Sequence, residues 1–110
     1  MKGSQLGEFE ELVLLSVGIL NGEAYGINVL DTISEQTGRK VTVSTVHTAM
    51  YRLEKKGFVE SYYGGASATR GGRKKRLYKI TQAGVKVLAE AKAQREAMWN
   101  LLPDFSFNYG

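Results

Sequence analysis

The sequence contains no cysteine, which excludes disulfides, thiolate nucleophiles and cysteine metal sites. It has one proline, Pro103, which excludes a proline-rich linker. It also has one histidine, His47, so a zinc site would depend on carboxylates and water alone. These absences predict a protein without a metal or cofactor, and they fit a reducing, cytoplasmic environment.

Long apolar runs are also missing. The longest, residues 12–20, is interrupted by Ser16 and Gly18 and is far shorter than the roughly 20 residues needed to cross a bilayer. Acidic side chains at positions 8, 10 and 11 lie where a signal peptide would have positive charge. We therefore expect no membrane partner. The 110 residues, 43% hydrophobic and 24% charged, suit a small globular protein.

Acidic residues are absent from one long segment, between Glu60 and Glu90. The formal charge of the whole chain is +4, yet residues 39–79 contain eleven Lys or Arg and only two acids, which gives that segment +9. The remainder is net acidic. A basic segment of this strength predicts contact with a polyanion, and the backbone of double-stranded DNA is the best candidate.

Enzymatic interpretations find little support in the sequence. The glycine pairs at 64–65 and 71–72 invite comparison with a phosphate-binding loop, but neither is followed by Lys-Ser or Lys-Thr at the start of a helix. Glu8, Glu10 and Glu11 are explained by a helix N-terminus, which favours negative charge. We therefore expect no catalytic residues and no enzymatic activity.

Apolar spacing and turn residues predict a mainly α fold with a small β-hairpin. The expected helices are 6–20, 24–36, 44–56 and 82–102, the third capped by Ser44 or Thr42 and the last capped by Thr81 and ended by Pro103. The second is expected to have one apolar face, and the third a buried stripe; these are Ile27, Leu30 and Ile33, and Val46, Ala49, Met50 and Leu53. A short extended piece is expected at 41–43, and hairpin strands at 58–63 and 73–80 flank a glycine-rich tip. This order is that of a winged helix-turn-helix DNA-binding domain, residues 1–81, followed by a C-terminal dimerisation helix and tail, residues 82–110.

The third helix and the hairpin wing are the predicted DNA-binding elements. In winged-helix proteins the helix enters the major groove and the wing meets phosphate. Arg52 is the best candidate for reading a base, because a guanidinium can bind guanine O6 and N7 together. The full predicted set is Ser44, Thr45, His47, Thr48, Tyr51, Arg52, Lys55, Arg70, Arg73, Lys74, Lys75 and Arg76.

Simpler explanations remain open for these residues. The helix face could be an ordinary polar surface, and the basic strand could be a solvated edge whose lysines prevent aggregation. Alternation places Lys75, Leu77 and Lys79 on one face of the strand and Arg76, Tyr78 and Ile80 on the other, and the sequence does not determine which face meets the core.

The first and last helices predict a homodimer. Apolar residues surround nearly the whole first helix, so it needs cover on more than one side. The last helix has an apolar stripe without a partner in this chain. The predicted interface residues are Leu12, Leu15, Val85, Leu88, Trp99 and Leu102. Trp99 has two open interpretations, interface packing or stacking with a flat aromatic effector.

Several motifs, in this order, resemble the PadR family of bacterial transcriptional regulators. Residues 12–20 and the Ala-Tyr-Gly of 24–26 resemble the family's apolar first helix and its Tyr-Gly pair. Residues 45–59 resemble its recognition helix, and residues 71–84 resemble its second wing strand and the Thr-x-x-Gly that opens the next helix. The chain departs from the pattern at His47 and Thr48, where the family usually has Tyr and frequently Pro.

The resemblance implies a winged-helix homodimer that binds a palindromic operator, usually as a repressor. Some members release DNA when they bind an aromatic compound, and certain short members hold flat ligands with a Trp on the last helix, the helix that contains Trp99 here. One alternative stays open, a winged-helix protein-interaction module without sequence-specific DNA binding. Neither the operator nor the effector follows from the sequence.

Overall fold

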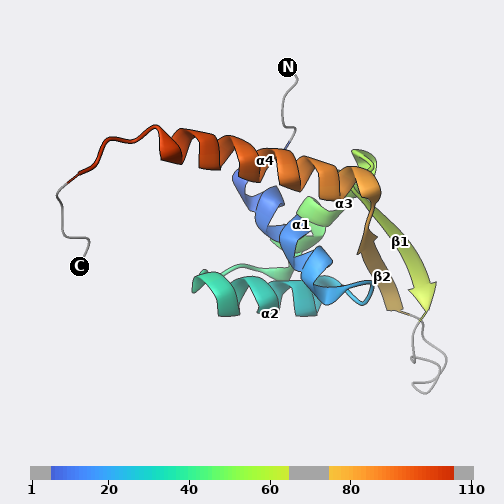
Figure 1. Cartoon of the computed structure of the whole chain (residues 1–110). Coiled ribbons are helices and arrows are strands. Elements are labelled where there is room, and N and C mark those ends of the chain that lie inside the picture. Colours follow the sequence, from blue (N-terminus) through green and yellow to red (C-terminus); the bar gives the residue numbers. More distant parts are fainter. Residues whose placement is uncertain (1–5, 65–74, 106–110) are drawn as a thin grey trace.

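The computed structural model describes residues 6–64 and 75–105. Four helices and one antiparallel hairpin follow in the order α1 (Glu8–Leu20), α2 (Gly26–Thr37), α3 (Val43–Lys55), β1 (Val59–Gly64), β2 (Lys75–Ile80) and α4 (Gln82–Asn100). Helices α1, α2 and α3 pack against one another, α4 crosses α1, and the hairpin lies at one end of this bundle (Figure 1). The mainly α fold with one hairpin is therefore confirmed.

Helix α1 is central to the core. Its residues Val13, Leu14 and Val17 are fully buried, while Leu15 and Ile19 remain 43% and 64% exposed. The helix begins two residues later than predicted, where the Gly7 N–H donates to the Glu10 carboxylate at 3.1 Å. The described part of the chain therefore covers only one side of this apolar helix.

Helix α2 differs from the prediction in the residues that it buries. Val29 and Ile33 face the core, whereas Ile27, expected on the buried face, is 52% exposed. The Tyr25 N–H donates to the Asn28 side chain at 2.7 Å, so the helix begins at Gly26, two residues later than expected. Ile33 and, in part, Leu30 are buried as predicted. The prediction was wrong for Ile27, because the buried stripe runs through Gly26, Val29 and Ile33 and leaves position 27 outside it.

Helix α3 begins at Val43, which shortens the extended piece predicted at 41–43. Thr42, and not Ser44, is its N-cap, with extended backbone and a side-chain oxygen that accepts from the Thr45 N–H at 3.2 Å. The predicted buried stripe is confirmed, since Val46, Ala49, Met50 and Leu53 are each at most 5% exposed. Its opposite face is consequently directed to solvent.

The hairpin pairs β1 with β2 from Val59↔Ile80 to Gly64↔Lys75. Two interactions attach it to the turn between α1 and α2. Ala24 forms an isolated antiparallel bridge with Tyr78, whose N–H donates to the Ala24 carbonyl at 2.8 Å, and the Tyr62 hydroxyl donates to the Gly22 carbonyl. The extended residue that pairs with the hairpin is therefore Ala24, and not one of residues 41–43.

Helix α4 begins at the Thr81 cap, whose side chain accepts from the Gly84 N–H at 3.0 Å. Gly84 lets the first turn approach the Phe58 carbonyl, since a Cβ built there would lie 2.3 Å from that oxygen. Ala91 is the last buried residue, and every described residue from Lys92 to Phe105 is exposed. Among the described residues, no helix is long and apolar enough to span a membrane.

Candidate nucleic-acid interface

The outward face of α3 collects the side chains predicted to meet DNA. Ser44, Thr45, His47, Thr48, Tyr51, Arg52 and Lys55 are all exposed. Tyr51 is 60% exposed, and the Lys55 ammonium lies 5.3 Å from the centre of its ring. Hydroxyl, aromatic and cationic groups therefore share one solvent-facing surface, as a helix that binds in the major groove requires.

Two of these side chains already have partners within the helix. The Thr48 hydroxyl donates to the Ser44 carbonyl at 3.0 Å, and the hydroxyls of Thr45 and Thr42 lie 2.8 Å apart. Each hydroxyl oxygen keeps acceptor capacity, but the Thr48 proton is engaged. Arg52 and Lys55, by contrast, make no ion pair among the described residues.

His47 lies against the start of α2. A Cβ built on Gly26 would lie 2.6 Å from the His47 Nε2 and 2.9 Å from its Cε1, so the glycine makes room for the imidazole. The His47 imidazole on α3 thus lies directly beside Gly26, the first residue of α2. The sequence showed both residues but not that they touch, because 21 positions separate them.

The structure shows which face of the hairpin packs toward the core, which the sequence left open. Arg76 and Tyr78 lie on the face that packs toward α3 and the core cluster. Lys75 and Lys79 lie on the other face and are exposed, although Leu77 between them is buried. The Lys75 ammonium lies 4.0 Å from the centre of the Tyr25 ring, a cation–π contact that holds it beside the start of α2. The predicted residues Arg70, Arg73 and Lys74 lie outside the described residues.

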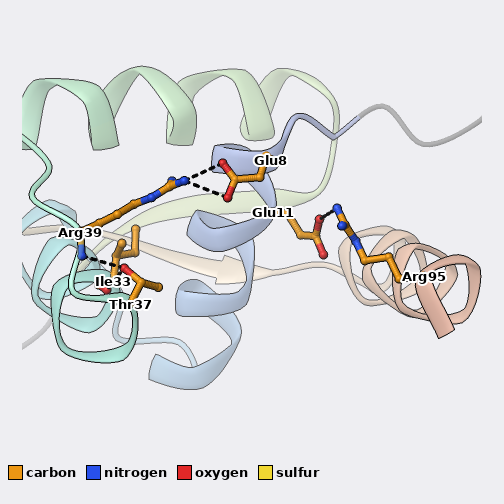
Figure 2. A network of polar contacts seen from close by, with 6 residues as sticks. All are labelled: Glu8, Glu11, Ile33, Thr37, Arg39 and Arg95. Carbon is orange, nitrogen blue, oxygen red and sulfur yellow. Dashed lines mark hydrogen bonds and ion pairs between the residues drawn. The ribbon is translucent and has the colours of Figure 1, made fainter. Parts of the chain in front are cut away.

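Three cations of the basic segment are paired with carboxylates. Arg39 donates from Nη2 to both Glu8 oxygens at 2.9 Å, as Figure 2 shows, and Arg76 Nη2 lies 3.0 Å from Glu54. The Lys56 ammonium lies 2.8 Å from the carboxylate of the buried Glu10. Burial acts to raise the pKa of Glu10, but hydrogen bonds from Lys56 and the Gly7 N–H outweigh it and lower that pKa. These three ion pairs join parts of the fold: α1 to the segment after α2, α1 to the end of α3, and α3 to β2.

A second surface is an apolar groove of about 870 Å³ between α1 and α4. Four of the six predicted interface residues line it: Leu15, Val85, Leu88 and Trp99. Leu12 instead packs partly buried against the core, and Leu102 lies beyond the end of α4, half exposed. An ion pair from Arg95 Nη2 to Glu11, 2.8 Å long, crosses the groove (Figure 2). Ile19 and Ile80, which sequence analysis did not select, also line it.

Comparison with known proteins identifies the family. The model of the transcriptional regulator PadR-like family matches residues 14–90, more than half of the chain. This chain belongs to the PadR-like family. The resemblance seen in the sequence is confirmed, and with it the assignment to a family of transcriptional regulators. The match ends at residue 90 within α4, before the groove residues Arg95 and Trp99.

Solved structures similar to this PadR-like chain agree on the fold. A PadR family regulator from Eggerthella lenta is 25% identical, with a TM-score of 0.65 over 84% of this chain and 80% of that one. A transcriptional regulator from Clostridium thermocellum is 26% identical, with a TM-score of 0.67 over 90% and 91%. A PadR-like regulator from Bacillus cereus, 22% identical with a TM-score of 0.68 over 88% and 93%, shares the fold.

A curated relative extends the comparison to sequence. An uncharacterised protein of Lysinibacillus sphaericus, called protein X, is 35% identical over 74 residues. The match covers 66% of this chain, which spans 65% of the length of that relative.

Proposed function

We propose that this protein is a dimeric, sequence-specific DNA-binding transcriptional regulator that acts as a repressor in the cytoplasm. Residues 1–81 form the DNA-binding unit and residues 82–110 the dimerisation helix and tail. The observation that supports this best is the exposed α3 face, where Arg52 and Lys55 make no ion pair among the described residues. Unpaired cations cost little to bring to DNA, because no protein ion pair must first be broken.

The two DNA-binding elements have different roles in this proposal. Arg52 reads base edges in the major groove, and the exposed Lys75 and Lys79 of β2 neutralise phosphates. If two subunits together neutralise about 6 to 10 phosphates, affinity falls on the order of 10³- to 10⁵-fold between 50 and 200 mM salt. Binding that does not change with salt would contradict the proposal.

The experiment first selects bound fragments from random duplex DNA and then measures affinity for the selected site and for random sequence. Arg52→Ala should reduce the ratio of the two affinities, whereas Lys75→Ala should weaken both equally. Lys86→Ala, an exposed cation on α4, is the charge-matched control. Recovery of a palindromic site supports the two-fold arrangement, and equal effects of Arg52→Ala and Lys75→Ala would refute the division of roles.

The dimer in this proposal is supported by two uncovered apolar surfaces. The groove leaves Ile19 64% and Val85 54% exposed. Met98 near the end of α4 is 66% exposed, and Leu101, directly after the helix, is 82% exposed. Contiguous apolar surface of this kind is typical of an interface. Sedimentation should give a dimer at micromolar concentration, with the two α3 helices about 34 to 36 Å apart as one turn of duplex requires. A folded monomer would refute this part.

The second function in the proposal is sensing of a flat aromatic effector at Trp99. The indole is 65% exposed and lines the apolar groove, and the family resemblance implies such ligands. The effector changes DNA binding only if it binds the two forms of the dimer with different affinities. Because Trp99 is the only tryptophan, the tryptophan fluorescence of the protein reports directly on ligand binding at this residue. Absence of quenching by a broad panel of planar aromatic compounds would refute this role.

The alternative function, a protein-interaction module with an acidic partner, predicts a different result in the same selection. Such a module would bind its acidic partner stably through the basic face, and it would show no preference among DNA sequences.

A further inference from the structure

The last turn of α3 holds an acidic residue, Glu54, in the middle of the basic segment. A carboxylate there is unfavourable in two ways. It lies near the negative end of the helix dipole, and it would repel a phosphate brought to the same face. Its side chain is only 30% exposed, so it is directed away from open solvent.

Glu54 is joined to both strands of the hairpin. Its Oε1 accepts from Arg76 Nη2 of β2 at 3.0 Å, and its Oε2 accepts from the Ser61 hydroxyl of β1 at 2.7 Å. The same Arg76 nitrogen also donates to the Ser61 oxygen at 3.1 Å. Three side chains from three elements thus form a closed set of hydrogen bonds, which we call the clasp.

Arg76 is further restrained by aromatic rings. Its guanidinium carbon lies 5.9 Å from the ring centre of Tyr63 and 5.6 Å from that of Tyr78. The Arg76 side chain is 46% exposed, but its Nη2 is engaged by one carboxylate and one hydroxyl, so moving the guanidinium toward a phosphate would break these interactions. On the opposite face of the strand, Lys75 lies 4.0 Å from the Tyr25 ring centre but makes no ion pair among the described residues, so it has no carboxylate to leave before it meets a phosphate.

We propose that the clasp of Glu54, Ser61 and Arg76 sets the position of the wing relative to α3, so that Arg76 is a positioning residue and does not bind phosphate. This inference rests on the proposed DNA-binding function, and it gives Arg76 a different role from the DNA contact that the sequence predicts. A two-stranded hairpin has little stability of its own and takes its orientation from what it packs against. On one side it is anchored at Gly22 and Ala24; the clasp anchors the other side to the helix that reads DNA.

Electrostatics and positioning predict opposite signs for one substitution. Glu54→Gln removes a negative charge from a DNA-binding face, so by charge alone it should strengthen binding. If the clasp positions the wing, the same change should weaken binding roughly 3- to 10-fold, the range for an interaction in a side-chain network. Measurement of operator affinity for Glu54→Gln therefore separates the two explanations.

The salt dependence of affinity adds a second readout. Arg76→Gln should weaken binding by a similar factor and leave the slope of log affinity against log salt unchanged, whereas Lys75→Gln should reduce the slope by about 0.9 for each phosphate that is no longer neutralised. The double variant Glu54→Gln/Arg76→Gln should bind no worse than either single one, because both disrupt the same clasp. A reduced slope for Arg76→Gln together with tighter binding by Glu54→Gln would overturn the proposal.

Amide hydrogen exchange of the DNA-free protein tests the clasp without DNA. Glu54→Gln and Arg76→Gln should both accelerate exchange in β1 and β2, and the charge-matched control Lys86→Gln on α4 should not. Unchanged hairpin exchange in both clasp variants would overturn the proposal. If the wild-type protein binds no DNA, the proposed function fails, and hairpin exchange still decides whether the clasp holds the wing.

Discussion

Gly84→Ala provides a sharp test of how α4 joins the winged-helix unit. The added methyl carbon would lie 2.3 Å from the Phe58 carbonyl oxygen, 3.2 Å from its carbon and 2.7 Å from the Ile80 Cγ1. The same Phe58 oxygen accepts the Thr81 N–H at 3.0 Å, so it cannot move away without weakening the start of the helix. The clash is therefore with backbone that is already committed to a hydrogen bond.

The expected cost follows from two opposing terms. Overpacking against a fixed backbone costs about 3 kcal/mol, the upper end of the usual range. Replacing glycine by alanine within a helix returns about 1 kcal/mol. Gly84→Ala should therefore lower the free energy of unfolding by about 2 kcal/mol, which moves a urea midpoint by about 1 M for a typical slope near 2 kcal/mol/M.

Gly18→Ala is the matched control within the same protein. It lies in α1, and a Cβ there would lie 3.8 Å from the Ile80 Cδ1, an ordinary contact. Gly18→Ala should raise the free energy of unfolding of the protein by up to about 1 kcal/mol. Both variants are unfolded in urea at equal protein concentration and followed by circular dichroism. A Gly84→Ala protein as stable as wild type would refute the close approach of α4 to Phe58.

Three further predictions concern other parts of the molecule. Gly26→Ala forces only the end of the His47 side chain to move, so it should change the free energy of unfolding by less than about 1 kcal/mol. It should also lower operator affinity to that of His47→Ala. Unchanged affinity would contradict a DNA role for His47. Glu10→Gln should lower the free energy of unfolding by about 1 kcal/mol at pH 7. Urea titrations should show this difference in full above the unfolded-state pKa near 4.5, and should show it disappear as the pH falls through the lowered folded-state pKa. A stability difference that grows in acid would be inconsistent with this. Tyr62→Phe should cost about 0.5 to 1.5 kcal/mol and accelerate hairpin exchange by removing the donor to the Gly22 carbonyl, and exchange equal to wild type would exclude that anchor.

Local patterns were sufficient for the elements themselves. The stripe Val46, Ala49, Met50 and Leu53 has the helical period, and it fixed correctly which side of α3 is buried. The Thr81 cap was also predictable, because Thr before a helix satisfies an otherwise unpaired backbone N–H. Ile27 shows the limit: period alone does not say which of two neighbouring apolar positions meets the core, and here Val29 does.

The charge of a sequence segment does not show which of its cations the fold pairs with carboxylates. The sequence counts Arg39, Lys56 and Arg76 as part of one basic segment, yet the fold pairs each with a glutamate, at positions 8, 10 and 54. Two of these partners lie in α1, far away along the chain. No local rule could have separated these cations from Arg52 and Lys75, because a salt bridge depends on which elements become neighbours.

The sequence by itself determined the order of helices and hairpin, the outward polar face of α3 and the family, because periodicity, caps and motifs are local properties of a chain. The tertiary structure decided which face of the hairpin meets the core, how Arg76 is held at Glu54, and that Leu15, Val85 and Trp99 share one groove. These are distances between residues remote in sequence, and only packing of the whole core sets them.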